Sequence, residues 1–334
     1  MSHVCRAWQD GRVKGEILSQ RVSILSVGAP MPVVEKGLAE HFDVRCEPAA
    51  DIRGLAISGS HTAIDAAFVE GFPRLEIVST SGVGYDHIDA VAMAHRGVVV
   101  TNTPGVLTEE VADLALGLIL STVRRLPQAD RHLREGRWIE RPFPLSATLR
   151  GRKVGILGLG RIGKALARRL AACDLEIEYH GRNPQPEVTY RYHPTLLSLA
   201  ESCDLLVVMV SGGAATRHMV NREVLEALGP DGILINVGRG SVVDEVALVE
   251  ALRDRSILGA GLDVFEDEPR VPAELIAMEQ VVLLPHVGSG SVHTRQAMGR
   301  LMVDNLVSWF VGKGPITPVP ESSALGLVRG QGRN

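Results

Sequence analysis

Short runs of valine, isoleucine and leucine alternate with helical segments along most of the chain. Such continuous apolar runs are typical of parallel strands that are covered on both faces. The pattern therefore predicts an α/β protein with two doubly wound parallel sheets. The strands are expected at residues 22–27, 42–46, 54–58, 77–80 and 98–102, and then at 154–157, 175–180, 205–210, 233–237, 259–262 and 281–284.

Two helical patterns connect these regions. One begins near Thr108, which we interpret as its N-cap, and its apolar residues 111–123 predict a buried helix that crosses into the second region. The other, at 292–310, follows the last strand and is expected to pack back on the first region. The sequence thus predicts two domains with a hinge and a cleft between them. The substrate domain is expected at 1–104 and 286–334, and the dinucleotide-binding domain at 105–285.

The most specific motif lies in residues 152–182. An apolar strand runs into Gly158, Gly160 and Gly163, and a helical pattern follows. In a nucleotide-binding βαβ unit these glycines allow a tight turn, close approach of the pyrophosphate to backbone N–H groups, and contact between helix and strand. The alternative is a glycine-rich turn of another α/β protein. The flanking strands and helix, at the right intervals, favour the nucleotide.

The residues at the end of the second strand of this βαβ unit indicate which nucleotide binds. Dehydrogenases that use NAD usually carry an acid there, whereas this chain has Gly181, Arg182 and Asn183. A guanidinium can bind a phosphate through two charge-assisted hydrogen bonds, so NADP (NADPH) is favoured over NAD. In the alternative, Arg182 is a solvated surface residue and Glu178, inside the predicted strand, binds the ribose.

Three charged residues follow strands of the second region, where ligands of open α/β sheets bind. They are Arg239, Glu268 and His286. A guanidinium that binds a carboxylate, and an imidazole oriented by a carboxylate, form a set suited to reducing a 2-oxo acid. Each residue alone has a plainer interpretation, because most histidines are not catalytic and Glu268 could belong to an acidic turn. Their coincidence at three strand ends favours the catalytic interpretation.

The chain resembles the D-isomer-specific 2-hydroxyacid dehydrogenases from about residue 22 to 319. The matching strings are SGVGYDHID, NTPGVLTEEVADLALGLIL, GRKVGILGLGRIGKALARRL, NVGRGSVVDEVALVEAL, GAGLDVFEDEP and LLPHVGSG. Through HGRN, GRW and HVGSGSVHTR it looks most like the NADPH-dependent hydroxyphenylpyruvate and glyoxylate/hydroxypyruvate reductases of that family. One departure is SGGAATRHM, where the family often has a proline-rich turn, and this leaves the role of Thr216 open.

The resemblance implies an activity and roles for residues. Hydride transfer from NADPH would reduce a 2-oxo acid to a D-2-hydroxy acid, with His286 as acid/base, Glu268 as its partner and Arg239 as the carboxylate clamp. Closure of the domains would exclude water. Further implied substrate contacts are Val83, Gly84 and Ser289, and further cofactor contacts are Arg161, Ile162, Val210, Thr216, Val237, Gly238, Asp263 and Gly288.

The resemblance also implies a homodimer. An arm at about residues 125–150 would be exchanged between subunits, and Trp138 would reach the partner's active site. The alternative is that Trp138 only packs the arm.

Composition and charge limit the other possible classes. A net charge of −4 without long charge runs predicts neither nucleic-acid nor membrane binding. The apolar run at 111–123 is too short to cross a bilayer. Four widely spaced cysteines predict reduced thiols in the cytoplasm and no metal, and no signal peptide is expected. Two alternatives stay open: a non-catalytic NAD(P)-sensing scaffold of the co-repressor type, and a dehydrogenase of another small anion.

Overall fold

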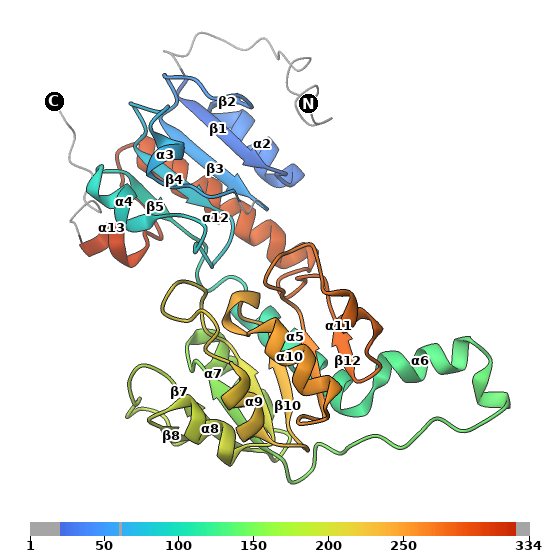
Figure 1. Cartoon of the computed structure of the whole chain (residues 1–334). Coiled ribbons are helices and arrows are strands. Elements are labelled where there is room, and N and C mark those ends of the chain that lie inside the picture. Colours follow the sequence, from blue (N-terminus) through green and yellow to red (C-terminus); the bar gives the residue numbers. More distant parts are fainter. Residues whose placement is uncertain (1–20, 60–61, 325–334) are drawn as a thin grey trace. The chain divides into compact units, whose positions relative to one another are not determined.

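The computed structural model describes residues 21–59 and 62–324, so the leader at 1–20, with Cys5, lies outside the described part. The chain divides into two compact units (Figure 1). Unit 1 combines the chain up to Val106 with the chain from Val292, and unit 2 is Leu107–Ser291. The segment 286–291, which the sequence analysis assigned to the substrate domain, has its contacts in unit 2. The reason is that its backbone amides bond to Asp263 of that unit.

Unit 1 contains a five-stranded sheet of order β2-β1-β3-β4-β5, in which all neighbouring strands are parallel. This is the flavodoxin-like order. Separate hydrophobic clusters cover its two faces, which explains why β3 and β4 are buried along their whole length. The elements are β1 (Ser23–Gly28), α2 (Pro32–His41), β2 (Asp43–Arg45), β3 (Gly54–Ser58), α3 (Ala66–Val69), β4 (Ile77–Thr80), α4 (Ala90–His95), β5 (Val99–Thr101), α12 (Val292–Phe310) and α13 (Pro320–Ala324).

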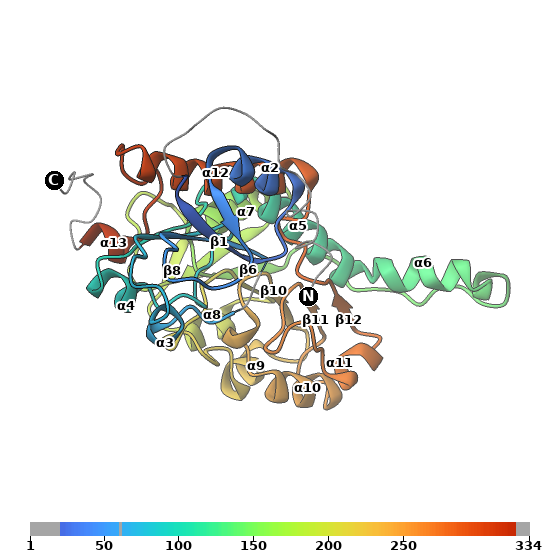
Figure 2. The ribbon, with the colours of Figure 1, turned by 90° about the horizontal axis from the view of Figure 1, so that it is seen from above.

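The C-terminal helix α12 packs on α2 and on the strands of unit 1 (Figure 2). A Cβ at Gly299 would lie only 2.7 Å from Cγ2 of Val34, so the absence of a side chain allows the two helices to approach. The buried hydroxyl of Ser79 in β4 donates to the carbonyl oxygen of Met302 at 3.0 Å. These contacts fix the position of α12 along the sheet.

Unit 2 contains a seven-stranded parallel sheet of order β12-β11-β10-β9-β6-β7-β8. The direction of winding reverses between β6 and β9, as in the Rossmann fold, where ligands bind at this switch point. The elements are α5 (Thr108–Arg124), α6 (Leu126–Arg134), η1 (Arg137–Ile139), β6 (Lys153–Leu157), α7 (Arg161–Ala171), β7 (Glu176–His180), β8 (Arg191–His193), α8 (Leu196–Ser202), β9 (Leu205–Val208), α9 (Arg222–Leu228), β10 (Ile233–Asn236), η2 (Gly240–Val242), α10 (Glu245–Arg253), β11 (Gly259–Leu262), α11 (Ala273–Ala277) and β12 (Val281–Leu283).

The predicted fold class is confirmed, because both sheets are parallel and lie in α/β units. Two local expectations were wrong. Thr108 is the first residue of α5, and the N-cap position is Leu107, which makes no capping hydrogen bond. Strand β8 was not predicted, because its three residues, Arg-Tyr-His, have no apolar run. Among the described residues no helix combines the length and the apolarity that a membrane crossing needs.

A buried polar cluster anchors β8 to the rest of the sheet. Glu178 of β7 is fully buried, and its Oε2 accepts hydrogen bonds from Nε2 of His193 at 2.7 Å and from the hydroxyl of Ser202 at 2.5 Å. Burial alone would raise the pKa of Glu178, but the hydrogen bonds from Ser202 and His193 outweigh it and lower the pKa below its usual value. The Glu178 carboxylate is therefore charged, and it holds the sheet edge together.

We predict that Glu178→Gln lowers the free energy of unfolding by about 1–3 kcal/mol, because it removes the charge from buried hydrogen bonds. A carboxyl whose pKa is lowered by folding stabilises the protein above its unfolded pKa, and this contribution is lost as the pH falls through the folded value. The difference between the parent and Glu178→Gln should therefore shrink below about pH 4. Urea unfolding over a pH series measures it.

The matched control is Glu176→Gln on the same strand, where the side chain is exposed and lies 3.6 Å from Lys153. An exposed pair of this kind contributes little, so this variant should unfold within about 0.5 kcal/mol of the parent. Equal stability of the Glu178 and Glu176 variants would show that the buried cluster does not stabilise this edge.

Candidate active site

The glycine-rich turn after β6 has room for a ligand at one of its three glycines. Gly158 has φ +97°, and a Cβ there would lie 2.7 Å from Cγ1 of Val210, while a Cβ at Gly163 would lie 2.4 Å from the carbonyl oxygen of Gly158. The protein itself requires glycine at both positions. At Gly160, in contrast, a Cβ would meet no atom within 4 Å. The open side of Gly160 fits the close approach of a pyrophosphate.

The helix that follows this turn is not capped by a side chain. Gly160 is the N-cap of α7, so Arg161 and Ile162 contribute the first backbone N–H groups. The first N–H groups of a helix need an acceptor from outside it, and the helix dipole favours a negative one. This end of α7 therefore fits a phosphate group.

The loop after β7 lies against the glycine-rich turn. Gln185 donates from Nε2 to the carbonyl oxygen of Leu159 at 2.9 Å, and the hydroxyl of Tyr192 donates to the carbonyl oxygen of Gly181 at 3.3 Å. Sequence analysis did not single out Gln185 or Tyr192. Both contacts hold the segment that carries Arg182.

Arg182 and Asn183 are exposed, and within the described part of the chain the Arg182 guanidinium has no hydrogen-bond or ion-pair partner. The alternative ribose ligand, Glu178, is fully buried and bonded to His193 and Ser202. Its carboxylate is thus already engaged within the sheet edge. At positions 181–183, directly after β7, the loop carries a cation and an amide and no acid, whereas the acid further along it, Glu187, pairs with Lys164.

The ends of β9 and β10 complete this edge. A Cβ at Gly238 would lie 2.7 Å from the carbonyl oxygen of Val210, and the amide of Val237 donates to Val208. In the departing SGGAATRHM segment, the hydroxyl of Thr216 donates to the carbonyl oxygens of Ser211 and Gly213 at 2.7 and 3.2 Å. Thr216 thus closes its own turn. These hydrogen bonds restrict a segment that lacks the prolines often present there in the family.

His286 and Glu268 form a hydrogen-bonded pair in the site. Nδ1 of His286 lies 2.6 Å from Oε2 of Glu268, and Oε1 of Glu268 accepts from the amide of Phe265 at 3.0 Å. A carboxylate can only accept, so Nδ1 is the donor, and Nε2 is left without a hydrogen-bond partner within the described residues. The imidazole can therefore exchange a proton with a ligand through Nε2.

Asp263 fixes the backbone around His286 through hydrogen bonds. This residue is 1% exposed, and its two carboxylate oxygens accept from the amides of Val287 and Gly288, each at 2.8 Å. Burial raises the pKa of Asp263, whereas these two hydrogen bonds lower it and leave a net increase. The amide of His286 donates to the carbonyl oxygen of Asp263, and His286 has φ 53°, in the left-handed region. Ser289 lies within the turn that the Gly290 amide closes onto the carbonyl oxygen of Val287.

Arg239 stands on a loop that Asn236 closes. The buried Asn236 side chain accepts from the amide of Gly238 at 3.1 Å and donates to the carbonyl oxygen of Arg239 at 3.0 Å. The next residue, Gly240, packs directly on the loop of Glu268, since a Cβ there would lie 1.8 Å from the carbonyl carbon of Phe265. Asn236 and Gly240 were not recognised as functional from the sequence, although both lie within the NVGRG string.

Unit 1, described by itself, contains a loop with free backbone donors. Val83 and Gly84 follow β4, and the carbonyl oxygen of Val83 accepts from Nδ2 of Asn102 at 2.8 Å. Within the described residues neither the Val83 nor the Gly84 amide donates a hydrogen bond. Adjacent free N–H groups are suited to an anion such as a carboxylate.

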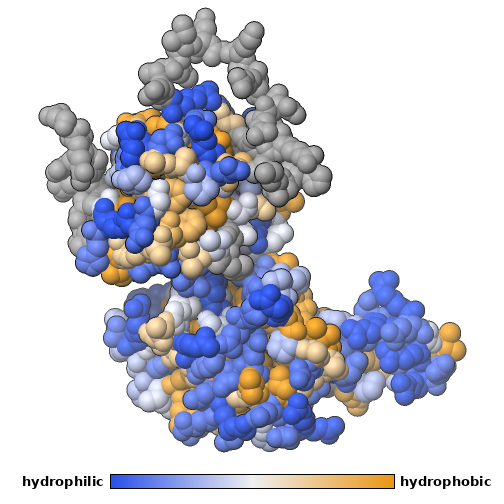
Figure 3. All heavy atoms as spheres, turned by 45° about the horizontal axis from the view of Figure 1, so that its top comes forward, coloured by the Kyte–Doolittle hydropathy of each residue, from blue (hydrophilic) through white to orange (hydrophobic). Residues whose placement is uncertain are grey.

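The arm that contains α6 and η1 projects from unit 2 (Figures 1 and 2). Trp138 is 65% exposed, Ile139 93% and Leu145 99%, and hydrophobic residues lie among the hydrophilic ones on this projection (Figure 3). Nε of Arg137 and Oε1 of Gln128 are buried without a hydrogen-bond partner in the described part of the chain. Exposed apolar side chains together with unsatisfied polar atoms are typical of a surface that another chain covers.

Comparison with known proteins shows the family to which this chain belongs. The family model for the NAD-binding domain of D-isomer-specific 2-hydroxyacid dehydrogenases matches residues 116–288. The chain belongs to this family. It is 51% identical over 265 residues to a glyoxylate/hydroxypyruvate reductase of Arabidopsis thaliana, covering 79% of this chain and 85% of that one. It is 49% identical over 263 residues to a hydroxyphenylpyruvate reductase of Plectranthus scutellarioides, covering 79% and 84%.

A solved structure agrees. The NADPH-dependent glyoxylate/hydroxypyruvate reductase of Sinorhizobium meliloti, in complex with NADP and malonate, is 52% identical, with a TM-score of 0.87 over 91% of this chain and 98% of that one. The resemblance found in the sequence is confirmed. The protein is therefore an NAD(P)-dependent oxidoreductase of the 2-hydroxyacid dehydrogenase type.

The contrast between two glycines provides a test of the nucleotide site. We predict that Gly160→Ala folds normally, with a melting temperature within about 2 °C of the parent, because its Cβ meets no protein atom. NADPH binding should weaken at least about tenfold, since the methyl group occupies the space left for the pyrophosphate. Calorimetric unfolding and fluorescence titration with NADPH measure the two effects.

Gly163→Ala is the comparison variant, because its Cβ would clash with the carbonyl oxygen of Gly158 and should destabilise the fold itself. Unchanged NADPH affinity in a well-folded Gly160→Ala protein would show that the pyrophosphate does not bind at this turn.

Proposed function

We propose that this protein is an NADPH-dependent reductase of small 2-oxo acids, with glyoxylate, hydroxypyruvate and hydroxyphenylpyruvate as candidate substrates and D-2-hydroxy acids as products. The observation that carries the proposal is the 2.6 Å hydrogen bond between His286 and Glu268 at strand ends of a nucleotide-binding sheet. The names of the compared relatives from Arabidopsis, Plectranthus and Sinorhizobium support the choice of substrates.

Different residues of this chain have different roles in the reaction. NADPH, when bound along the edge formed by β6, β7, β9 and β10, supplies the hydride that the 2-oxo carbon accepts. Protonated His286 delivers the proton on Nε2 to the developing alkoxide, and the charge of Glu268 stabilises the protonated imidazole until then. Arg239, with the amides of Val83 and Gly84, binds the substrate carboxylate and orients the carbonyl group.

We propose NADPH rather than NADH as the preferred cofactor. The exposed Arg182 without a partner and the burial of Glu178 both support this preference. A guanidinium binds a 2′-phosphate, and the positions directly after β7 carry no carboxylate that would repel it.

We also propose that the protein acts as a homodimer in which the arm at about 125–150 is exchanged, so that Trp138 contacts the partner's substrate. The exposed apolar side chains of the arm support this assembly. A monomer in sedimentation, or equal effects of Trp138→Ala on the KM for hydroxyphenylpyruvate and glyoxylate, would count against it. Cys46, Cys173 and Cys203 form no disulfide within the described residues, which fits a reducing compartment. We propose the cytoplasm, which fractionation of the host cells can test.

The charge of Glu268 provides a test of the acid/base pair. Reduction needs the protonated imidazole of His286, which the carboxylate stabilises. Glu268→Gln keeps the size and a hydrogen bond but removes the charge. We predict that kcat/KM of the reduction, measured by NADPH oxidation with glyoxylate, falls by about tenfold or more.

The matched control is Asp267→Asn, which removes a neighbouring carboxylate that pairs with Arg270 on the exposed turn. Its kcat/KM should equal that of the parent. A parent protein that oxidises NADPH with none of the 2-oxo acids would favour the non-catalytic scaffold, and oxidation only with another small anion would favour the other dehydrogenase class. A kcat/KM in Glu268→Gln equal to that of the parent would exclude Glu268 as the charge partner.

The cofactor preference has its own test. We predict that Arg182→Asp lowers kcat/KM for NADPH by about 10- to 100-fold, because a charge-assisted hydrogen bond is lost and repulsion of the 2′-phosphate is added. Activity with NADH should change much less. Arg182→Gln, which removes the charge without adding repulsion, should lie between the two proteins. Equal use of NADPH and NADH by the unmodified enzyme would contradict the preference.

A further inference from the structure

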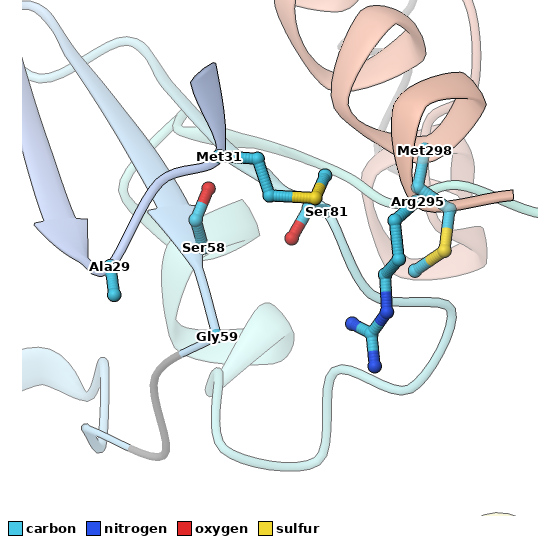
Figure 4. Close-up of a pocket in the computed structure, with 7 residues that line it drawn as sticks. All are labelled: Ala29, Met31, Ser58, Gly59, Ser81, Arg295 and Met298. Atoms are coloured by element: carbon cyan, nitrogen blue, oxygen red, sulfur yellow. The ribbon is translucent and has the colours of Figure 1, made fainter. Parts of the chain in front are cut away.

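A small cavity lies at the carboxyl edge of the sheet in unit 1, next to the loop of Val83 and Gly84. Its volume is about 60 Å³, which is room for a few water molecules or for one carboxylate group. Ala29, Met31 and Met298 give it an apolar wall. The polar groups on its lining come from Ser58, Ser81 and Arg295. Figure 4 shows Arg295 and Met298 extending from α12, opposite the loop and strand ends that carry the other lining residues.

The packing of α12 on the sheet brings Arg295 to the cavity. The hydroxyl of Ser79 holds the carbonyl oxygen of Met302 over the middle of the sheet. Arg295 precedes Met302 by two helical turns, which is about 10 Å along the axis. Because α12 and β4 run in opposite directions, this displacement brings Arg295 to the carboxyl end of the strands, where Ser81 lies. Ligands of open α/β sheets bind at that edge.

Two of the three polar groups in the cavity have no partner. The hydroxyl of Ser58 donates to Sδ of Met302 at 3.8 Å. Within the described residues, the Arg295 guanidinium and the Ser81 hydroxyl make no hydrogen bond, and no carboxylate pairs with Arg295. An arginine stays charged at any physiological pH, and beside an apolar wall its charge is stabilised by an anion that accepts from its planar donors. The cavity is therefore complementary to a carboxylate with an apolar chain attached.

The geometry points to Arg295 and Ser81 as the binding site for a second, distal carboxylate of the 2-oxo acid substrate. This inference rests on the proposed function. Ser81 is two residues from Val83, so the free amides proposed to bind the 1-carboxylate and the cavity belong to one loop of one unit. Because this loop carries both groups, we expect the side chain of a substrate whose first carboxylate is bound by the amides to extend toward the cavity. Among 2-oxo acids of equal length, those with a distal carboxylate are then favoured, and Arg295 determines that preference.

Pairs of substrates that differ only in the distal group test the inference. Oxaloacetate and 2-oxobutyrate form one pair, and 2-oxoglutarate and 2-oxopentanoate form a longer one, because a carboxylate replaces a methyl group in each. We expect the unmodified protein, with NADPH, to prefer the dicarboxylate of at least one pair by tenfold or more in kcat/KM. Arg295→Gln should reduce that preference at least tenfold, Arg295→Lys should retain part of it, and Ser81→Ala should reduce it less.

The matched control is Arg300→Gln, which removes an exposed arginine of the same helix whose guanidinium donates to Gln296. It should leave the preference unchanged. Melting temperatures establish that each variant is folded. No preference for either dicarboxylate, or the same preference in Arg295→Gln, would overturn the inference while activity with glyoxylate still supported the proposed function.

One further result would also overturn it. If malonate changed the rate with glyoxylate through Arg295 without competing with glyoxylate, the cavity would bind a separate effector anion and not the substrate. Absence of activity with glyoxylate and with every other 2-oxo acid would instead contradict the proposed function itself.

Discussion

The buried carboxylate of Asp263 makes the hydrogen bonds on which the geometry of the candidate active site in unit 2 depends. It accepts from two successive amides of the loop after β12, and its own carbonyl oxygen accepts from the amide of His286. Asp263 directly follows β11, whose register with β10 and β12 is fixed by the parallel ladder. The position of the imidazole is therefore set by main-chain hydrogen bonding of the sheet, and only the final orientation comes from Glu268.

Contact between backbones is the second constraint at this edge. The loop of Arg239 reaches the loop of Glu268 because Gly240 has no side chain, and Asn236 holds the Arg239 loop from below through two hydrogen bonds. Loops from three neighbouring strands are thus locked to one another before any ligand binds. Preorganisation of this kind lowers the reorganisation that a reaction would otherwise require.

Groups and spaces that the packing of the fold does not require indicate where ligands bind. The space beside Gly160, the amides of Val83 and Gly84, and the guanidinium of Arg295 are not needed for the packing of the described residues. Elsewhere the chain satisfies its buried charges internally, as Glu178 does with His193 and Ser202. A buried polar group with partners supports structure, whereas one at a strand end without partners is available for binding.

Much of this organisation could be predicted from the sequence, because continuous apolar runs specify buried parallel strands and the glycine spacing specifies the nucleotide turn. The strand-end positions of Arg239, Glu268 and His286 followed from the same periodicity. Strand β8 could not be predicted, since Tyr192 and His193 enter the sheet through tertiary contacts with Tyr179 and Glu178 and not through an apolar pattern of their own. The roles of Asn236 and Gly240 and the meeting of Arg295 with Ser81 were likewise decided by the tertiary structure. Hydrophobic periodicity is local, whereas a cavity lined by both residue 81 and residue 295 exists only after a helix and a sheet distant in sequence have packed together.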